Sequence, residues 1–102
     1  MHNNWIAGEW IGSSNSQNNL NPSDLDDVVG EYVRASEADV QDAIAAAHAA
    51  WPSWSLSTPQ QRFDALDQIG SEILARKNEL GELLAREEGK TLPEAIGEVA
   101  RG

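Results

Sequence analysis

The sequence has 102 residues, of which 7 are basic and 17 acidic, and its formal net charge is -10. A chain of this length can bury one modest core, and its cations are spread among carboxylates, which argues against binding nucleic acid or an anionic membrane surface. The absence of cysteine excludes disulfides, thiolate zinc sites and a thiol nucleophile within these residues.

The N-terminal third of the sequence predicts strands joined by loops. Two short aromatic and β-branched runs in residues 4–11 flank Gly8, which can adopt the positive φ of a tight turn, and they predict a small hairpin. The polar residues 12–19 offer nothing to bury and predict a loop. Residues 28–33 are rich in β-branched and aromatic side chains and predict one further strand. The hairpin and the strand are together expected within residues 4–34.

The rest of the sequence predicts four α-helices over residues 36–54, 58–76, 78–88 and 92–102. In the first helix, Ser36 followed by Asp39 is typical of an N-cap with a variant capping box, and Pro52 is expected to end the helix or kink its last turn. An apolar stripe runs along this helix, with its two tryptophans expected to pack in a core at the helix end: Val40, Ile44, Ala47, Trp51 and Trp54.

Start and stop signals delimit the other helices. Thr58, with Pro59 and Gln61 after it, marks the start of the second helix. Asn78 is expected to start the third helix, and Gly89 supplies the left-handed residue that commonly follows a helix end. Two ion pairs at i to i+4 spacing are expected on exposed faces: Glu72 with Arg76, and Glu82 with Arg86.

The fourth helix opens at Thr91 and carries an apolar stripe, but no stop signal precedes Gly102. A natural domain seldom finishes halfway through an amphipathic pattern. The sequence is therefore expected to be truncated at its C-terminus.

The densest acidic group consists of Asp24, Asp26, Asp27 and Glu31. A calcium loop would need an oxygen ligand where Val28 stands and a bidentate Glu at its twelfth position, so a solvated acidic turn is favoured.

Other polar residues give weak signals for a site. Glu87 and Glu88 point about 100° apart on a helix and therefore predict a solvated helix end in place of an acid/base pair. His48 is a lone imidazole, which favours a helix-edge residue over catalysis or metal binding, and His2 is expected in a frayed terminus. We expect no catalytic, cofactor-binding or metal-binding residue among these 102.

The sequence has neither an apolar run near the roughly 20 residues that span a bilayer nor a recognisable signal peptide. A cytoplasmic location is therefore expected.

Several features, in this order, resemble the amino-terminal region of the aldehyde dehydrogenase superfamily. The resemblance runs from Trp5 to the last residue and is carried by the spacing of these pieces: Ile6-Ala7-Gly8-Glu9-Trp10, Asn21-Pro22, Val28-Val29-Gly30-Glu31, the alanines before Trp51-Pro52-Ser53-Trp54, Thr58-Pro59 with Arg62, the leucine ladder from Leu66 to Leu84, Glu88-Gly89-Lys90-Thr91, Glu94-Ala95 and Glu98-Val99. The stretch from Asn21 to Tyr32 is similar to the branch that oxidises 2-oxoglutarate semialdehyde.

The resemblance implies an α/β parent fold in which residues 1–102 form the amino-terminal part of the dinucleotide-binding domain. It implies a parent enzyme, usually a dimer or tetramer, in which a thiolate attacks the aldehyde, hydride passes to NAD or NADP, and activated water releases the acid. The nucleophilic Cys, general-base Glu, oxyanion-hole Asn and dinucleotide-binding residues of the family are expected outside residues 1–102. This segment is expected to be inactive scaffold that packs against the remainder of the parent chain and, alone, is loosely packed or self-associates.

The alternative is a small acidic helical module that binds another protein without catalysis. Trp5 and Trp10 could then anchor the hairpin on the partner. Such a module requires a complete fourth helix and apolar stripes that satisfy one another, whereas the enzyme segment is expected to expose them.

Overall fold

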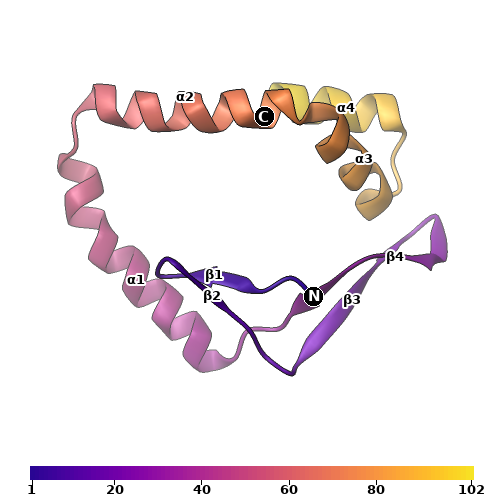
Figure 1. The fold of residues 1–102 in the computed structure, drawn as a ribbon, viewed down its shortest axis with the longest axis horizontal. Helices are drawn as coiled ribbons and strands as arrows, with labels where there is room; N and C mark the ends of the chain where they lie inside the picture. The colour runs from indigo at the N-terminus through magenta and orange to yellow at the C-terminus, as the bar shows by residue number, and fades with distance from the viewer. The chain divides into compact units, whose positions relative to one another are not determined.

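Figure 1 shows the computed structural model, which describes all residues from Met1 to Gly102. The structure divides into two compact units, one of Met1–Asn19 and Gly30–Ser57 and the other of Leu20–Val29 and Thr58–Gly102. The expected order of a hairpin, further strand structure and four helices is confirmed. The elements are β1 (Asn4–Ile6), β2 (Glu9–Ile11), β3 (Ser16–Asn21), β4 (Asp24–Val33), α1 (Glu37–Leu56), α2 (Pro59–Ala75), α3 (Lys77–Glu88) and α4 (Leu92–Arg101).

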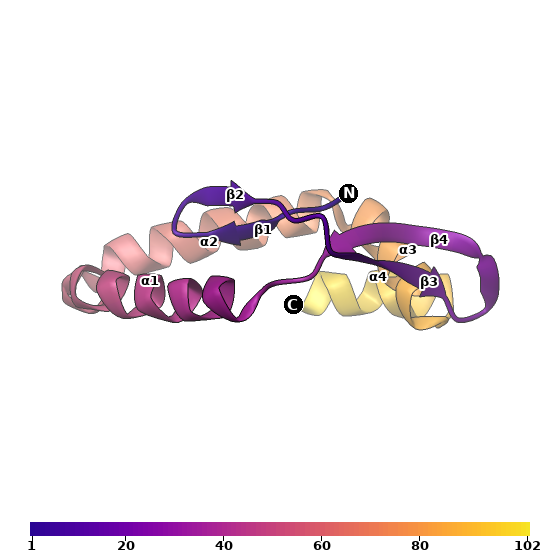
Figure 2. The same ribbon diagram turned by 90° about the horizontal axis from the view of Figure 1, so that it is seen from below.

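The first hairpin has the expected position. β1 and β2 pair antiparallel, with Trp5 opposite Trp10, and the turn between them is made by Ala7 and Gly8, both at positive φ. The two indole rings lie 4.8 Å apart in an edge-to-face arrangement. Side chains alternate along a strand, so Ile6 lies on the opposite face from Trp5. The first hairpin lies alongside α1 (Figure 2), and β1 contacts that helix.

The strand content after this hairpin was underestimated. β3 covers residues 16–21, where the sequence predicted a loop up to residue 19, and β4 begins at Asp24 and not at Val28. β3 is almost entirely polar, so its pattern carries no burial signal, and it is held by backbone pairing with β4 in a second two-stranded sheet.

His2 is not frayed. It forms a parallel bridge with Tyr32 of β4, in which the His2 N–H donates to the Glu31 carbonyl at 2.7 Å and the Val33 N–H donates to the His2 carbonyl at 3.0 Å. The imidazole also stacks on the Tyr32 ring at 4.8 Å. Pairing with a distant strand orders this terminus, and no local sequence signal reports such pairing.

The expected N-caps of α1 and α2 are confirmed. In each, the cap side chain accepts a hydrogen bond from the third helical N–H, and the side chain of that third residue accepts one from the cap N–H in return; the pairs are Ser36 with Asp39 and Thr58 with Gln61. Gly89 follows α3 in the left-handed conformation, also as expected.

Two helix boundaries differ from expectation. α1 continues through Pro52 to Leu56, so the proline does not end it. Serine hydroxyls bond helix carbonyls on either side of the ring, Ser53 to Ala50 and Ser55 to Pro52, both at 3.1 Å. α3 begins after Arg76 and not at Asn78, and the side chain of this N-cap residue makes no capping hydrogen bond to the helix backbone.

Full burial is confined to a few positions. Val33 is the buried apolar residue of the first unit, and Ala95, at 0% exposure, is that of the second. Around Ala95, α3 packs closely on α4, because a Cβ on Gly81 would lie only 2.5 Å from the Ile96 side chain and 2.9 Å from its Cα. None of the four helices combines the length and apolar composition needed to cross a bilayer.

Candidate functional site

His48 lies on α1 without an acidic or hydroxyl neighbour in its hollow. The hollow, of about 340 Å³, is lined by Ala47, His48 and Trp51.

Three of the four carboxylates of the acidic group, those of Asp24, Asp27 and Glu31, have separate partners. Asp24 accepts a bond from the N–H of Asp26 at 3.2 Å, and the Ser16 hydroxyl donates to Glu31 across the second sheet. Asp27 pairs with Arg86. No set of three or more such side chains is gathered as a metal ligand set.

Asp27 forms the most tightly bonded polar cluster, and the expected solvated turn is wrong at this position. The Arg86 guanidinium donates to both oxygens of Asp27, at 2.9 and 2.6 Å, and the Asn21 amide donates at 3.1 Å. These bonds, the one from Arg86 foremost, lower the pKa of Asp27 from 3.8 to about 2. The carboxylate therefore stays charged near neutral pH and ties the second hairpin to α3.

Neither expected i to i+4 ion pair forms. Arg86 selects Asp27, 59 positions away, in place of Glu82. Arg76 binds Glu79 within the first turn of α3, with N–O distances of 3.0 and 2.6 Å, in place of Glu72. In both cases a bidentate fork outcompetes a single flexible contact.

A second cluster surrounds the α3–α4 corner. Lys90 lies 2.7 Å from Glu88 and 2.6 Å from Glu98, and the hydrogen bond with Glu88 is the main cause that raises the pKa of Lys90. The ammonium is therefore protonated at neutral pH and cannot serve as a base or amine nucleophile. Next to it, a Cβ on Gly89 would lie 2.9 Å from both Pro22 and Ser23, so only glycine fits.

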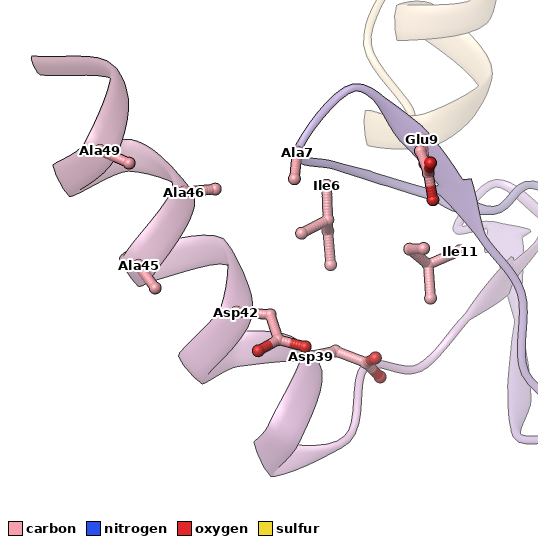
Figure 3. Close-up of a pocket in the computed structure, with 9 residues that line it drawn as sticks. All are labelled: Ile6, Ala7, Glu9, Ile11, Asp39, Asp42, Ala45, Ala46 and Ala49. Atoms are coloured by element: carbon pink, nitrogen blue, oxygen red, sulfur yellow. The ribbon is translucent and has the colours of Figure 1, made fainter.

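A hollow of the first unit lies between the first hairpin and α1 (Figure 3). We call it the hairpin groove; its volume is about 580 Å³ and its lining residues are Ile6, Ala7, Glu9, Ile11, Asp39, Asp42, Ala45, Ala46 and Ala49. Ile6 and Ile11 point from the hairpin toward α1, and Ala46 points from α1 toward the hairpin. The sequence pattern did not reveal the groove, because its alanines lie opposite the apolar stripe that marks the helix.

That apolar stripe of α1 is exposed, as the resemblance to an enzyme segment led us to expect, and the core packing of its tryptophans at the helix end does not form within residues 1–102. Trp51 is 65% exposed and Trp54 45%. α2 presents a similar surface, and its exposed side chains include Phe63, Leu66, Ile69 and Leu74. Apolar surface of this extent marks a place where other protein packs.

These clusters hold parts of the structure together. Asp27 and Lys90 keep fixed charges near neutral pH; Asp27 joins β4 to α3, and Lys90 joins the end of α3 to α4. The hairpin groove and the apolar faces of α1 and α2 can recognise apolar surface. Sequence reasoning had no signal for the Asp27 and Ser16 pairings, because their partners lie far along the chain.

Comparison with known proteins gives one consistent result. The sequence profile of the Aldehyde dehydrogenase family matches residues 10–102. The alpha-ketoglutarate semialdehyde dehydrogenase of Haloferax volcanii is 38% identical over 100 residues, covering 96% of this chain and 21% of the relative.

Solved structures agree with the sequence comparison. The succinate-semialdehyde dehydrogenase of Burkholderia pseudomallei is similar with a TM-score of 0.90 and 30% identity, over 98% of this chain and 21% of that one. The betaine aldehyde dehydrogenase of Staphylococcus aureus, solved in complex with NAD+, has a TM-score of 0.89 and 28% identity, over 97% and 20%. The chain thus spans about one fifth of the length of the proteins it matches.

Proposed function

The chain belongs to the aldehyde dehydrogenase family, and we propose from this membership that it forms the amino-terminal part of the dinucleotide-binding domain of a longer enzyme. That enzyme oxidises an aldehyde to a carboxylic acid, with NAD or NADP as the hydride acceptor. The observation that carries the proposal is the match of the family profile to residues 10–102. These residues include the strands and helices from β2 to α4.

Residues 1–102 supply scaffold to this enzyme. The polar clusters at Asp27 and Lys90 fix hairpin and helices within their unit, and the exposed faces of α1 and α2 present apolar surface for the rest of the enzyme to cover. The alternative of a self-sufficient binding module is disfavoured, because its apolar stripes would have to cover one another, whereas those of α1 and α2 are exposed.

The dinucleotide does not fit these residues. A pyrophosphate binds free N–H groups at a helix N-terminus, but the starts of α1 and α2 are already capped by Ser36 and Thr58. The starts of α3 and α4 carry Glu79 and Glu94, which would repel phosphate, and Glu79 already binds Arg76 at the start of α3. The hairpin groove is lined by carboxylates without a cation. These features support the proposal that the cofactor binds other parts of the enzyme and that residues 1–102 take part in no chemical step.

The substrate is an aldehyde that also carries a carboxylate, in the manner of 2-oxoglutarate semialdehyde. This assignment rests on the relative from Haloferax volcanii and on the likeness of Asn21 to Tyr32 to that branch. The segment's own net charge of -10 would repel such an anion. The cationic groups that bind the substrate carboxylate consequently lie outside these residues.

The test is to express the longer protein and to follow nicotinamide reduction with 2-oxoglutarate semialdehyde, succinate semialdehyde and betaine aldehyde. We expect turnover, with a kcat/KM for the two carboxylated aldehydes at least ten-fold above that for the cationic one, and no turnover by residues 1–102 alone. Absence of reduction with every aldehyde and both cofactors would refute the proposed activity. Light scattering of the longer protein tests its assembly, for which we expect a dimer or tetramer.

A further inference from the structure

The hairpin groove has an apolar floor and an acidic end. Ile6, Ile11 and Ala46 are half-buried in it, while the alanines farther along α1 are exposed. The carboxylates of Asp39 and Asp42 lie beside the isoleucines near the start of α1 (Figure 3).

The charge of the groove is one-sided. Three carboxylates line it, from Glu9, Asp39 and Asp42, and no Lys, Arg or His is among its lining residues. One oxygen of Asp39 already accepts bonds from the backbone and hydroxyl of Ser36, at 2.7 and 2.8 Å. Neither Glu9 nor Asp42 has such a partner among the lining residues, and Asp42 is the one of the two that lies on α1, beside Asp39.

The shape and the charge select one kind of occupant. A Lys or Arg side chain lays its methylene stem on apolar surface while its head group reaches a carboxylate. A neighbouring branched aliphatic side chain would pack against the isoleucines and alanines of the groove, whose volume of about 580 Å³ accommodates both side chains. An acidic segment would meet like charge, and a purely polar one would leave the floor uncovered.

We propose that the hairpin groove receives a segment of the same polypeptide, from outside residues 1–102, in which a Lys or Arg adjoins a branched aliphatic residue. The proposal rests on the proposed function, since it requires the longer enzyme. The chain spans about one fifth of its relatives' length, so most of such an enzyme is available to supply the segment. A segment of the same polypeptide also reaches the groove at high effective concentration.

The first test compares two charge reversals in the longer protein. Asp42→Lys places a cation in the groove, whereas Glu37→Lys makes the same change of charge on the same helix outside the groove. We expect Asp42→Lys to lower Tm by several degrees more than Glu37→Lys, with the difference shrinking as salt is added. If Asp42→Lys costs no more than Glu37→Lys, the proposal is overturned.

The second test probes the chemistry of the occupant with two labelled synthetic peptides, one alternating leucine and arginine and the other leucine and glutamate. Fluorescence anisotropy with residues 1–102 should show binding of the arginine peptide alone, weakened at least five-fold by Asp42→Lys and less than two-fold by Glu37→Lys. The longer protein should bind the arginine peptide at least ten-fold more weakly, because its own segment fills the groove. Binding of both peptides alike overturns the charge complementarity, and equal binding by the longer protein overturns the source of the segment.

Aldehyde oxidation is measured separately, so the two proposals fail differently. An enzyme that oxidises aldehydes without any specific effect of Asp42→Lys leaves the function standing and removes the groove proposal. A protein that shows the Asp42→Lys effect but oxidises no aldehyde removes the proposed function and leaves the charge preference of the groove standing.

Discussion

The α3–α4 corner and helix α1 differ in how they cover their apolar surface. At the corner, Gly81 lets α3 approach Ile96 of α4 closely, Ala95 is fully buried, and Lys90 bridges two carboxylates. α1 contributes no fully buried residue and is apolar on two opposite sides, one of alanines against the hairpin and one of bulkier side chains that is exposed. The corner is completed by residues 1–102 themselves, whereas α1 needs a second neighbour.

The largest expected effect is that of Trp51→Ala on stability, which should differ between residues 1–102 alone and the longer protein. Trp51→Ala in residues 1–102 alone should change the free energy of unfolding by no more than about 0.5 kcal/mol, because the indole is already exposed. In the longer protein the same change should cost about 3 to 5 kcal/mol, as for a buried tryptophan. Denaturant unfolding of both proteins measures the contrast, and equal small costs would mean that the bulky face of α1 stays uncovered.

Gly81→Ala should break the corner. The new methyl would lie 2.5 Å from the Ile96 side chain and 2.9 Å from its Cα, so α3 and α4 must separate, at about 2 kcal/mol. Gly70→Ala in α2 is the matched control: nothing lies within 4 Å of its new methyl, and helix propensity should stabilise it by up to about 1 kcal/mol. Thermal unfolding measures whether each variant gains or loses stability. Stabilisation of both variants would contradict the close approach of α3 and α4.

Replacing the N-cap threonine of a helix should have a smaller effect on stability, and the size of this effect should depend on whether its hydroxyl accepts a hydrogen bond from the helix backbone. Thr58→Ala removes the hydroxyl that accepts the N–H of Gln61 at 3.1 Å and should cost about 1 kcal/mol. The Thr91 hydroxyl makes no such cap bond to the α4 backbone, so Thr91→Ala should cost less than about 0.5 kcal/mol. Urea denaturation of the two variants compares them, and equal losses would show that the capping box of α2 contributes nothing.

The smallest effect concerns the pH dependence of the Asp27–Arg86 pair, which is half-buried and screened by solvent. The pKa of Asp27 is lowered from 3.8 to about 2, so the pair stabilises the fold above pH 3.8 and this contribution is lost as the pH falls toward 2. Asp27→Asn should remove that acid-dependent part and leave the rest of the pH profile in place. Unfolding midpoints measured across this range, for wild type and variant, check the difference, and parallel profiles would exclude the pair as its source.

The sequence by itself determined the features whose partners lie within a few residues. The caps at Ser36 and Thr58, the turn at Gly8 and the left-handed Gly89 each depend on a side chain or backbone only a few positions away. The family could also be identified from the spacing of such local signals.

Only the tertiary structure decided the features that depend on distant partners. β3 carries no apolar alternation and forms by pairing with β4. Arg86 binds Asp27 and not the nearby Glu82. Gly81 leaves room for Ile96 on the next helix. The hairpin groove likewise depends on where a hairpin meets the alanine side of α1. Local propensity reflects hydrogen bonds and periodicity between residues close in the sequence. It holds no information about which distant group forms the stronger ion pair, pairs with a strand or leaves room for a close approach.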